Sequence, residues 1–232
     1  MPLPREPIAI RGGCNCGAVR YRITIPSFEE RQLYFVHAPE EASNPETPRL
    51  PLICFCHCND CRAATGSLLP SWCLAPKEMV TISCLPSQDD DGSMQRLRLA
   101  PHDASGDSER PSYVPAYGLV SGTEPTTGTW LRVYRGTDES MEGWDVDKRV
   151  HRSFCGRCGT NLFYVICPMP NKFTNMVDVY FGTVDREDLE KPWAQPERQV
   201  WHNYGISWIK DAVKDLDGPK HPSFSTKEFV QE

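Results

Sequence analysis

Cysteines gather in three short clusters that lie far apart in this chain, and this arrangement restricts its fold more than any other feature. The first cluster holds Cys14 and Cys16, the second runs from Cys54 to Cys61, and the third holds Cys155 and Cys158. Closely spaced thiols present two sulfurs to one soft metal ion. Two of the clusters can therefore close a four-sulfur site, and the remaining cluster then holds a metal of its own. We expect function at that second site.

The alternative to metal binding is a disulfide framework. The chain has 11 cysteines, an odd number, and most of them lie too close together to bridge one another without strain. It has no apolar signal core at its start and no run of membrane-spanning length. Metal-bound thiolates in a reducing cytoplasm fit this pattern better. The net charge of −6 argues against a nucleic-acid-binding surface.

The outer clusters predict a structural zinc site. Residues 155–159 read Cys-Gly-Arg-Cys-Gly, the form of a zinc knuckle, and glycines flank the first cluster on both sides. A redox dithiol and a coincidence of free thiols are the alternatives, but a redox dithiol normally opens a helix and neither flank looks helical. The predicted ligands are Cys14, Cys16, Cys155 and Cys158.

The middle cluster predicts a catalytic zinc site with three ligands, Cys56, Cys58 and Cys61. Three protein ligands leave the fourth position to water or substrate. Cys54 is the alternative, because in an extended strand it shares a face with Cys56 and would close the site as a fourth ligand. His57 would point away from that face.

The fold class expected from the sequence is mainly β, with twisted antiparallel sheets and few short helices. Short β-rich runs occur at residues 18–25, 79–83, 131–134, 150–154, 161–166, 176–181 and 199–201. A helical turn capped by Asp185 and a short amphipathic helix at 208–216 are expected near the end. Trp72, Trp201 and Trp208 are expected in the core or in the wall of a pocket.

The whole chain, residues 1–232, is expected to form a single domain with two loop insertions. These are the proline- and glutamate-rich segment 29–51 and the polar segment 86–128. Surface loops are the simpler interpretation of such composition, and lids over the site are the alternative.

With these motifs, the chain resembles the glutathione-dependent formaldehyde-activating enzyme family, which includes centromere protein V domains. The resembling segments include GCNCGAVRY at 13–21, CHCNDCR at 56–62 and RSFCGRCGT at 152–160, with further matches at 65–67, 162–164, 182–185, 200–202 and 207–209. The resemblance implies a Rab-exchange-factor-like zinc β fold, a structural zinc on the outer cysteines and a catalytic zinc on Cys56, Cys58 and Cys61. The two insertions, the extra Cys54 and the greater length depart from the family pattern.

A zinc ion with three thiolates is suited to holding a substrate thiol as thiolate at neutral pH, ready to add to an aldehyde or related electrophile. We therefore expect two zinc ions per chain and a carbon–sulfur lyase, for which the resemblance implies a glutathione-like thiol. Arg62, directly after the last ligand, would neutralise the site or bind a substrate carboxylate, and a solvated arginine is the alternative. Arg152 has a similar ambiguity. The alternatives are a non-enzymatic zinc scaffold that binds a protein partner, and an enzyme of specialised metabolism that acts on a larger electrophile. Oligomerisation stays open.

Overall fold

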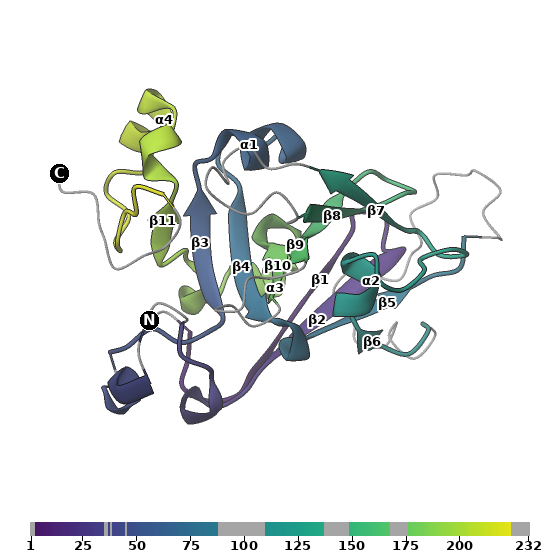
Figure 1. Cartoon of the computed structure of the whole chain (residues 1–232), viewed down its shortest axis with the longest axis horizontal. Helices are drawn as coiled ribbons and strands as arrows, with labels where there is room; N and C mark the ends of the chain where they lie inside the picture. The colour runs from purple at the N-terminus through teal and green to yellow at the C-terminus, as the bar shows by residue number, and fades with distance from the viewer. Residues whose placement is uncertain are drawn as a thin grey trace.

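The computed structural model describes residues 3–34, 37, 39–44, 46–87, 110–136, 149–167 and 176–223, and this part of the chain is mainly β (Figure 1). Its strands form two sheets. The smaller sheet has the order β1 (Ile8–Gly13), β2 (Val19–Ile25), β5 (Val80–Cys84), β6 (Val114–Pro115). The larger sheet has the order β11 (Arg198–Val200), β3 (Leu52–Cys56), β4 (Ser71–Pro76), β10 (Met176–Tyr180), β9 (Asn161–Cys167), β8 (Arg149–Cys155), β7 (Leu131–Gly136).

Each strand run expected from the sequence corresponds to an observed strand, and the mainly β class is confirmed. Neighbouring strands in both sheets pair in antiparallel fashion, except β11 and β3, which pair in parallel. Four strands, β1, β3, β4 and β6, lie outside the expected runs, although an extended strand at the middle cysteine cluster was considered. Strand β1 carries the glycines Gly12 and Gly13 at its end, and β4 ends in a proline, so residue preferences alone do not mark them as strands.

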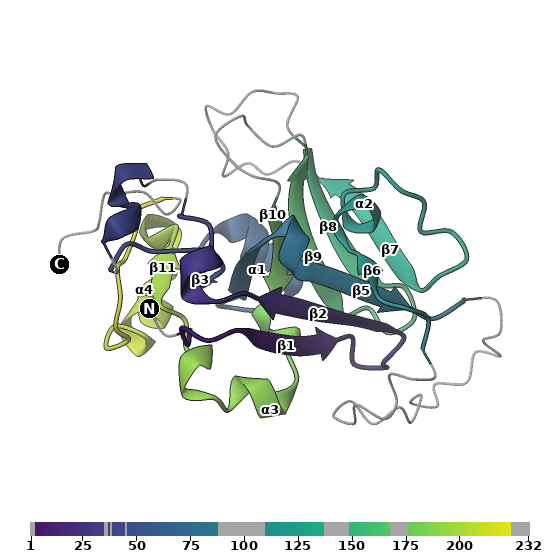
Figure 2. The ribbon, with the colours of Figure 1, turned by 90° about the horizontal axis from the view of Figure 1, so that it is seen from below.

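Alternation along the central strands gives the larger sheet two different apolar faces. Ile53, Cys73 and Val179 point into the main core, which the smaller sheet covers, and Tyr21 meets Phe163 edge to face across that core at 5.5 Å between ring centroids. Figure 2 shows β1, β2 and β5 alongside the larger sheet. Cys54 and Trp72 point to the opposite face and belong to a second apolar cluster. The cysteines of the middle cluster lie on this second face.

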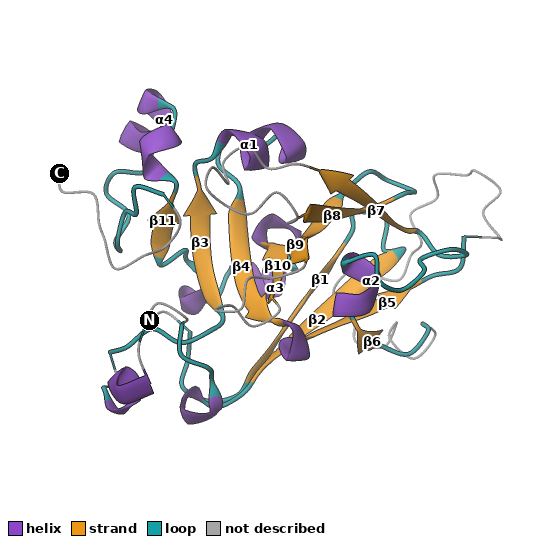
Figure 3. Cartoon of the chain, in the orientation of Figure 1, coloured by secondary structure: helices purple, strands orange, loops and turns teal. Residues whose placement is uncertain are grey.

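The helices are short (Figure 3). They are α1 (Asn59–Thr65), α2 (Tyr117–Val120), α3 (Arg186–Leu189) and α4 (Ser207–Ala212). Helix α2 packs against β8, β9 and β10 of the larger sheet. The helix expected at 208–216 is observed as α4 but ends four residues earlier, at Ala212. None of the helices in the described ranges is long and apolar enough to span a lipid bilayer.

The two predicted insertions differ in how much of them the structure describes. Residues 88–109, most of the segment 86–128, lie outside the described residues. The segment 29–51 contains two 3₁₀ turns, and its fully buried side chains include Arg31 and Tyr34. Arg31 donates from Nε to the carbonyl of Pro26 and from Nη2 to the carbonyl of Pro4. This segment therefore packs against the body of the protein at these residues.

Asp185 occupies the N-cap position of α3, as expected, but its side chain makes no capping hydrogen bond. Its carboxylate instead forms a two-point ion pair with Arg20 of β2, in which Nη1 lies 2.8 Å from Oδ1 and Nη2 contacts Oδ2. The two side chains are only 13% and 10% exposed. This pair connects the smaller sheet to the segment that follows β10.

We expect Asp185→Asn to lower the free energy of unfolding by about 2–4 kcal/mol, because it leaves a buried guanidinium without its charge partner. Glu190→Gln is the matched control. It makes the same carboxylate-to-amide change in an ion pair with Arg186 whose side chains are 82% and 65% exposed. The control should change stability by less than about 0.5 kcal/mol. Thermal unfolding of both variants measures the difference, and equal losses would contradict this account of the buried pair.

Candidate metal centres

The four outer cysteines converge on one point, as the sequence predicts. Their sulfurs all lie within 4.8 Å of one another. Cys14 and Cys16 come from the turn between β1 and β2, and Cys155 and Cys158 from the turn between β8 and β9. The Sγ atoms of Cys14 and Cys16 are 3.5 Å apart, and those of Cys16 and Cys155 are 3.7 Å apart. A tetrahedral zinc site with ordinary zinc–sulfur bonds has sulfurs about 3.8 Å apart, so these residues fit the metal.

The main chain holds both turns in the conformation that chelation requires. Gly17 and Gly159 have φ angles of 78° and 76°, in the left-handed region that glycine adopts without strain. The amide of Val19 donates to the sulfur of Cys14 at 3.2 Å. Burial raises the pKa of Cys16 to about 11. Burial also acts to raise the pKa of Cys158, but hydrogen bonds involving Thr160 outweigh it and lower that pKa to about 6. The lowered pKa of Cys158 favours its thiolate form, the form that binds a metal ion.

The middle cluster brings three sulfurs together, those of Cys56, Cys58 and Cys61, again within 4.8 Å of one another. Cys56 is the last residue of β3, Cys58 is the N-cap residue of α1, and Cys61 lies in the first turn of that helix. The amide of Cys61 donates to the sulfur of Cys58 at 3.2 Å. Helix α1, which the sequence analysis did not anticipate, is therefore what places two of the three sulfurs.

Cys54 is not a member of this group, although it is buried on the same face as Cys56. Residues i and i+2 of a regular strand are about 6.7 Å apart along the chain, too far for two sulfurs on one small ion unless the strand bends. Cys54 pairs on both sides, with Trp72 of β4 and Arg198 of β11, and these ladders keep β3 regular at that point. The geometry thus leaves three sulfurs in the group.

The pKa values of two of the grouped thiols, Cys56 and Cys61, are raised, so these thiols are hard to ionise without a cation. The pKa of Cys56 is raised well above its ordinary value, first by hydrogen bonds to Cys58 and Cys61 and then by burial. A bound divalent cation reverses this effect, because it favours the deprotonated form of every sulfur that it contacts. The donor set of three thiols in an apolar setting fits zinc or another soft divalent metal.

His57 points away from the sulfurs, toward β11. Its main-chain amide donates to the carbonyl of Val200 at 3.0 Å, and its Nε2 lies 2.8 Å from Oε1 of Gln199. Since that amide oxygen can only accept, Nε2 carries the proton. Burial lowers the pKa of His57, which favours the neutral ring. His57 thus anchors the ligand loop to the C-terminal part of the fold.

The two arginines considered from the sequence lie in different settings. Arg62 is half-buried on α1 and donates to Oδ1 of Asn59 at 3.3 Å. Arg152 of β8 is buried, lies over the ring of Tyr164 at 4.8 Å from its centroid, and donates to the hydroxyl of Tyr180 at 3.3 Å. Its positive charge lowers the pKa of Cys61, although other contacts of that thiol raise the pKa overall. Arg152 is thus a buried cation that acts on one thiol of the three-sulfur group.

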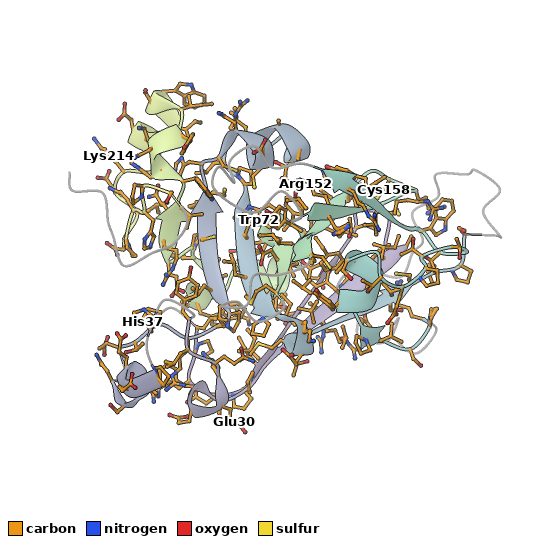
Figure 4. The ribbon with its side chains drawn as sticks, in the orientation of Figure 1. Glu30, His37, Trp72, Arg152, Cys158 and Lys214 are labelled. Carbon is orange, nitrogen blue, oxygen red and sulfur yellow. The ribbon has the colours of Figure 1, made fainter. Side chains whose placement is uncertain are left out.

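Aromatic side chains fill the face between Arg152 and the three-sulfur group. Trp72 stacks on Tyr180 at 3.8 Å between ring centroids and meets Tyr164 edge to face at 5.6 Å. Figure 4 shows the labelled Trp72 and Arg152 near the middle of the molecule. The labelled Cys158 of the outer site lies to their right in this view. The sequence analysis placed Trp72 in the core or a pocket wall but did not single out Tyr180. Trp208, expected to be buried, is 59% exposed.

No protein-family model matches this chain, and a search of the curated proteins found no match. The assignment of the site therefore depends on the geometry of the chain itself. Two groups of cysteines are placed to hold metal ions, one with four sulfurs and one with three.

Asp178 is a second polar residue on the site face that the sequence analysis missed. It lies in the middle of β10, in register with Leu74 on one side and Tyr164 on the other, and its Oδ1 is buried without a hydrogen-bond partner among the described residues. Burial raises the pKa of this carboxyl to about 8. A polar residue within the apolar strand sequence Met-Val-Asp-Val-Tyr is the signal that marks it.

We expect Asp178→Asn to change how stability depends on pH. The folded-state pKa is raised, so the stability that the wild-type carboxyl contributes is complete below about pH 4 and is lost as the pH rises through about 8. The isosteric amide does not ionise, so the variant should gain stability relative to wild type across that interval. Melting temperatures of both proteins from acid to mildly alkaline pH provide the measurement. A constant difference would contradict the raised pKa.

Proposed function

We propose that this protein is a zinc-dependent carbon–sulfur lyase that binds a thiol at the three-sulfur site and adds it reversibly to an aldehyde or related electrophile. The observation that carries the proposal is the unequal number of ligands: the outer group has four sulfurs and the middle group has three, with Cys54 held apart by its strand. A site with three protein ligands keeps one position for an exchangeable ligand.

When bound, a zinc ion supplies the acidity that keeps a substrate thiol deprotonated at neutral pH. The sulfur then forms a bond to the carbonyl carbon, and the carbonyl oxygen takes up a proton to become a hydroxyl group; the reverse reaction breaks the same bond. The chain contributes the apolar face of Trp72 and Tyr180, which restricts water, and the cation Arg152 beside it. Glutathione is the thiol that the family resemblance suggests.

A non-enzymatic zinc scaffold is the second candidate, and one observation favours it. Cys56, Cys58 and Cys61 are only 4%, 2% and 7% exposed, and shielded thiols are common in purely structural sites. The two candidates differ in whether an added thiol reaches the metal. An enzyme acting on a larger electrophile at the same site would also need such access.

We expect metal analysis of the purified protein to give about two zinc ions per chain, one for each cysteine group. Cys56→Ser should reduce this value to about one and leave the outer site filled. Cys54→Ser, the matched control on the same strand and face, should keep both ions. Loss of a zinc ion from the Cys54 variant would show that this residue is a ligand and would remove the basis of the proposed function.

We expect Cys58→Ser to abolish turnover of a thiol with an aldehyde while most of the stability remains, because serine still offers an acceptor at the N-cap of α1. Cys155→Ser should instead reduce soluble yield and thermal stability, since it opens the site that joins two distant turns. Activity assays and thermal unfolding of both variants separate the roles. Equal unfolding of the two would argue against one structural and one catalytic site.

A further inference from the structure

Charge limits which fourth ligand the three-sulfur site can accept. Three thiolates around a divalent cation leave one net negative charge, and an incoming thiolate adds another. The site lies on an apolar face, where unbalanced charge is costly. A neutral ligand such as an imidazole meets no such opposition, so the bare site would favour neutral ligands unless a cation lies nearby.

Arg152 is a buried cation that the described part of the fold places on this face. It is 4% exposed and projects from β8 onto the same face as the cysteines, where Tyr164 and Tyr180 hold its guanidinium from two neighbouring strands. Tyr180 in turn stacks on Trp72, which pairs with Cys54 on β3. A continuous set of side-chain and strand contacts thus runs from Arg152 to the strand that carries Cys56.

We propose that Arg152, held by Tyr180, is the positioning residue that makes the three-sulfur site select an anionic fourth ligand, a thiolate, over neutral ligands. This inference rests on the proposed function and names the charge class of its first substrate. The buried guanidinium offsets the added negative charge when a thiolate binds. It has little effect on a neutral ligand.

Protein loaded with cobalt in place of zinc provides the test, because the sulfur-to-metal absorption of cobalt reports on each change of ligand. The outer site already has four sulfurs, so changes on adding ligand arise from the three-sulfur site. The probes are 2-mercaptoethanol, which binds as an anion, and imidazole, which binds as a neutral molecule. Both are titrated at one fixed pH.

We expect Arg152→Met to weaken binding of 2-mercaptoethanol on the order of ten- to a hundredfold, because it removes a buried positive charge from the face that carries the three-sulfur group. Imidazole affinity should change by less than about threefold, since no charge is added. Arg152→Lys should recover much of the thiol affinity. Arg135→Met, which removes the same charge from an exposed position on the neighbouring strand β7, should leave both affinities unchanged.

Each outcome bears on a definite claim. Equal thiol affinity in wild type and Arg152→Met, or equal losses for the two probes, would overturn the role of Arg152. If Arg152→Met fails to fold or to take up cobalt, the comparison of Arg152→Lys with Arg152→Gln decides, and equal loss in both would show a packing role only. A wild-type spectrum that does not respond to 2-mercaptoethanol would overturn both this inference and the proposed function.

Discussion

The convergence of four sulfurs from two distant turns is the constraint on which the rest of this structure depends. Cys16 and Cys155 are separated by 139 positions in the chain, yet their sulfurs lie 3.7 Å apart. The first turn belongs to the smaller sheet and the second to the larger one, so a metal at this point fixes how the sheets meet. Closing so long a loop is entropically costly, and metal binding offsets that cost in the folded state only.

The alternation of side chains in the larger sheet then gives it one face in the main core and another face that carries the three-sulfur group. One face packs against the smaller sheet and is filled by aliphatic and aromatic residues. The other face carries Cys56, Trp72, Tyr180 and Arg152, which come from four strands that are far apart in the sequence. A one-residue shift in any of these strands would move its side chain to the wrong face, so the register of the sheet determines the site.

Local patterns in the sequence predict most of the strands and both cysteine groups. They do not predict α1. Most of its seven residues have polar or very small side chains, and a helix of about two turns is too short for an apolar face to be recognised from the sequence. The patterns place Asp185 correctly at the start of α3 but do not predict the partner of its side chain. The residue type and position suggest a helix cap, whereas Arg20, 165 positions away, competes successfully for the carboxylate. Asp178 and Tyr180 were missed because their importance comes from neighbours on other strands.

The Cys-x-Cys spacing shows how strongly chain conformation controls chemistry. Cys14 and Cys16 have this spacing in a glycine-flanked turn, and their sulfurs meet at 3.5 Å. Cys54 and Cys56 have the same spacing in a strand with partners on both sides, and only the second joins a metal-binding group. The two sites consequently differ in charge as well as in ligand number. With a divalent cation bound, four thiolates would saturate the outer site and repel further anions, whereas three thiolates would leave one position, which we propose is taken by another sulfur.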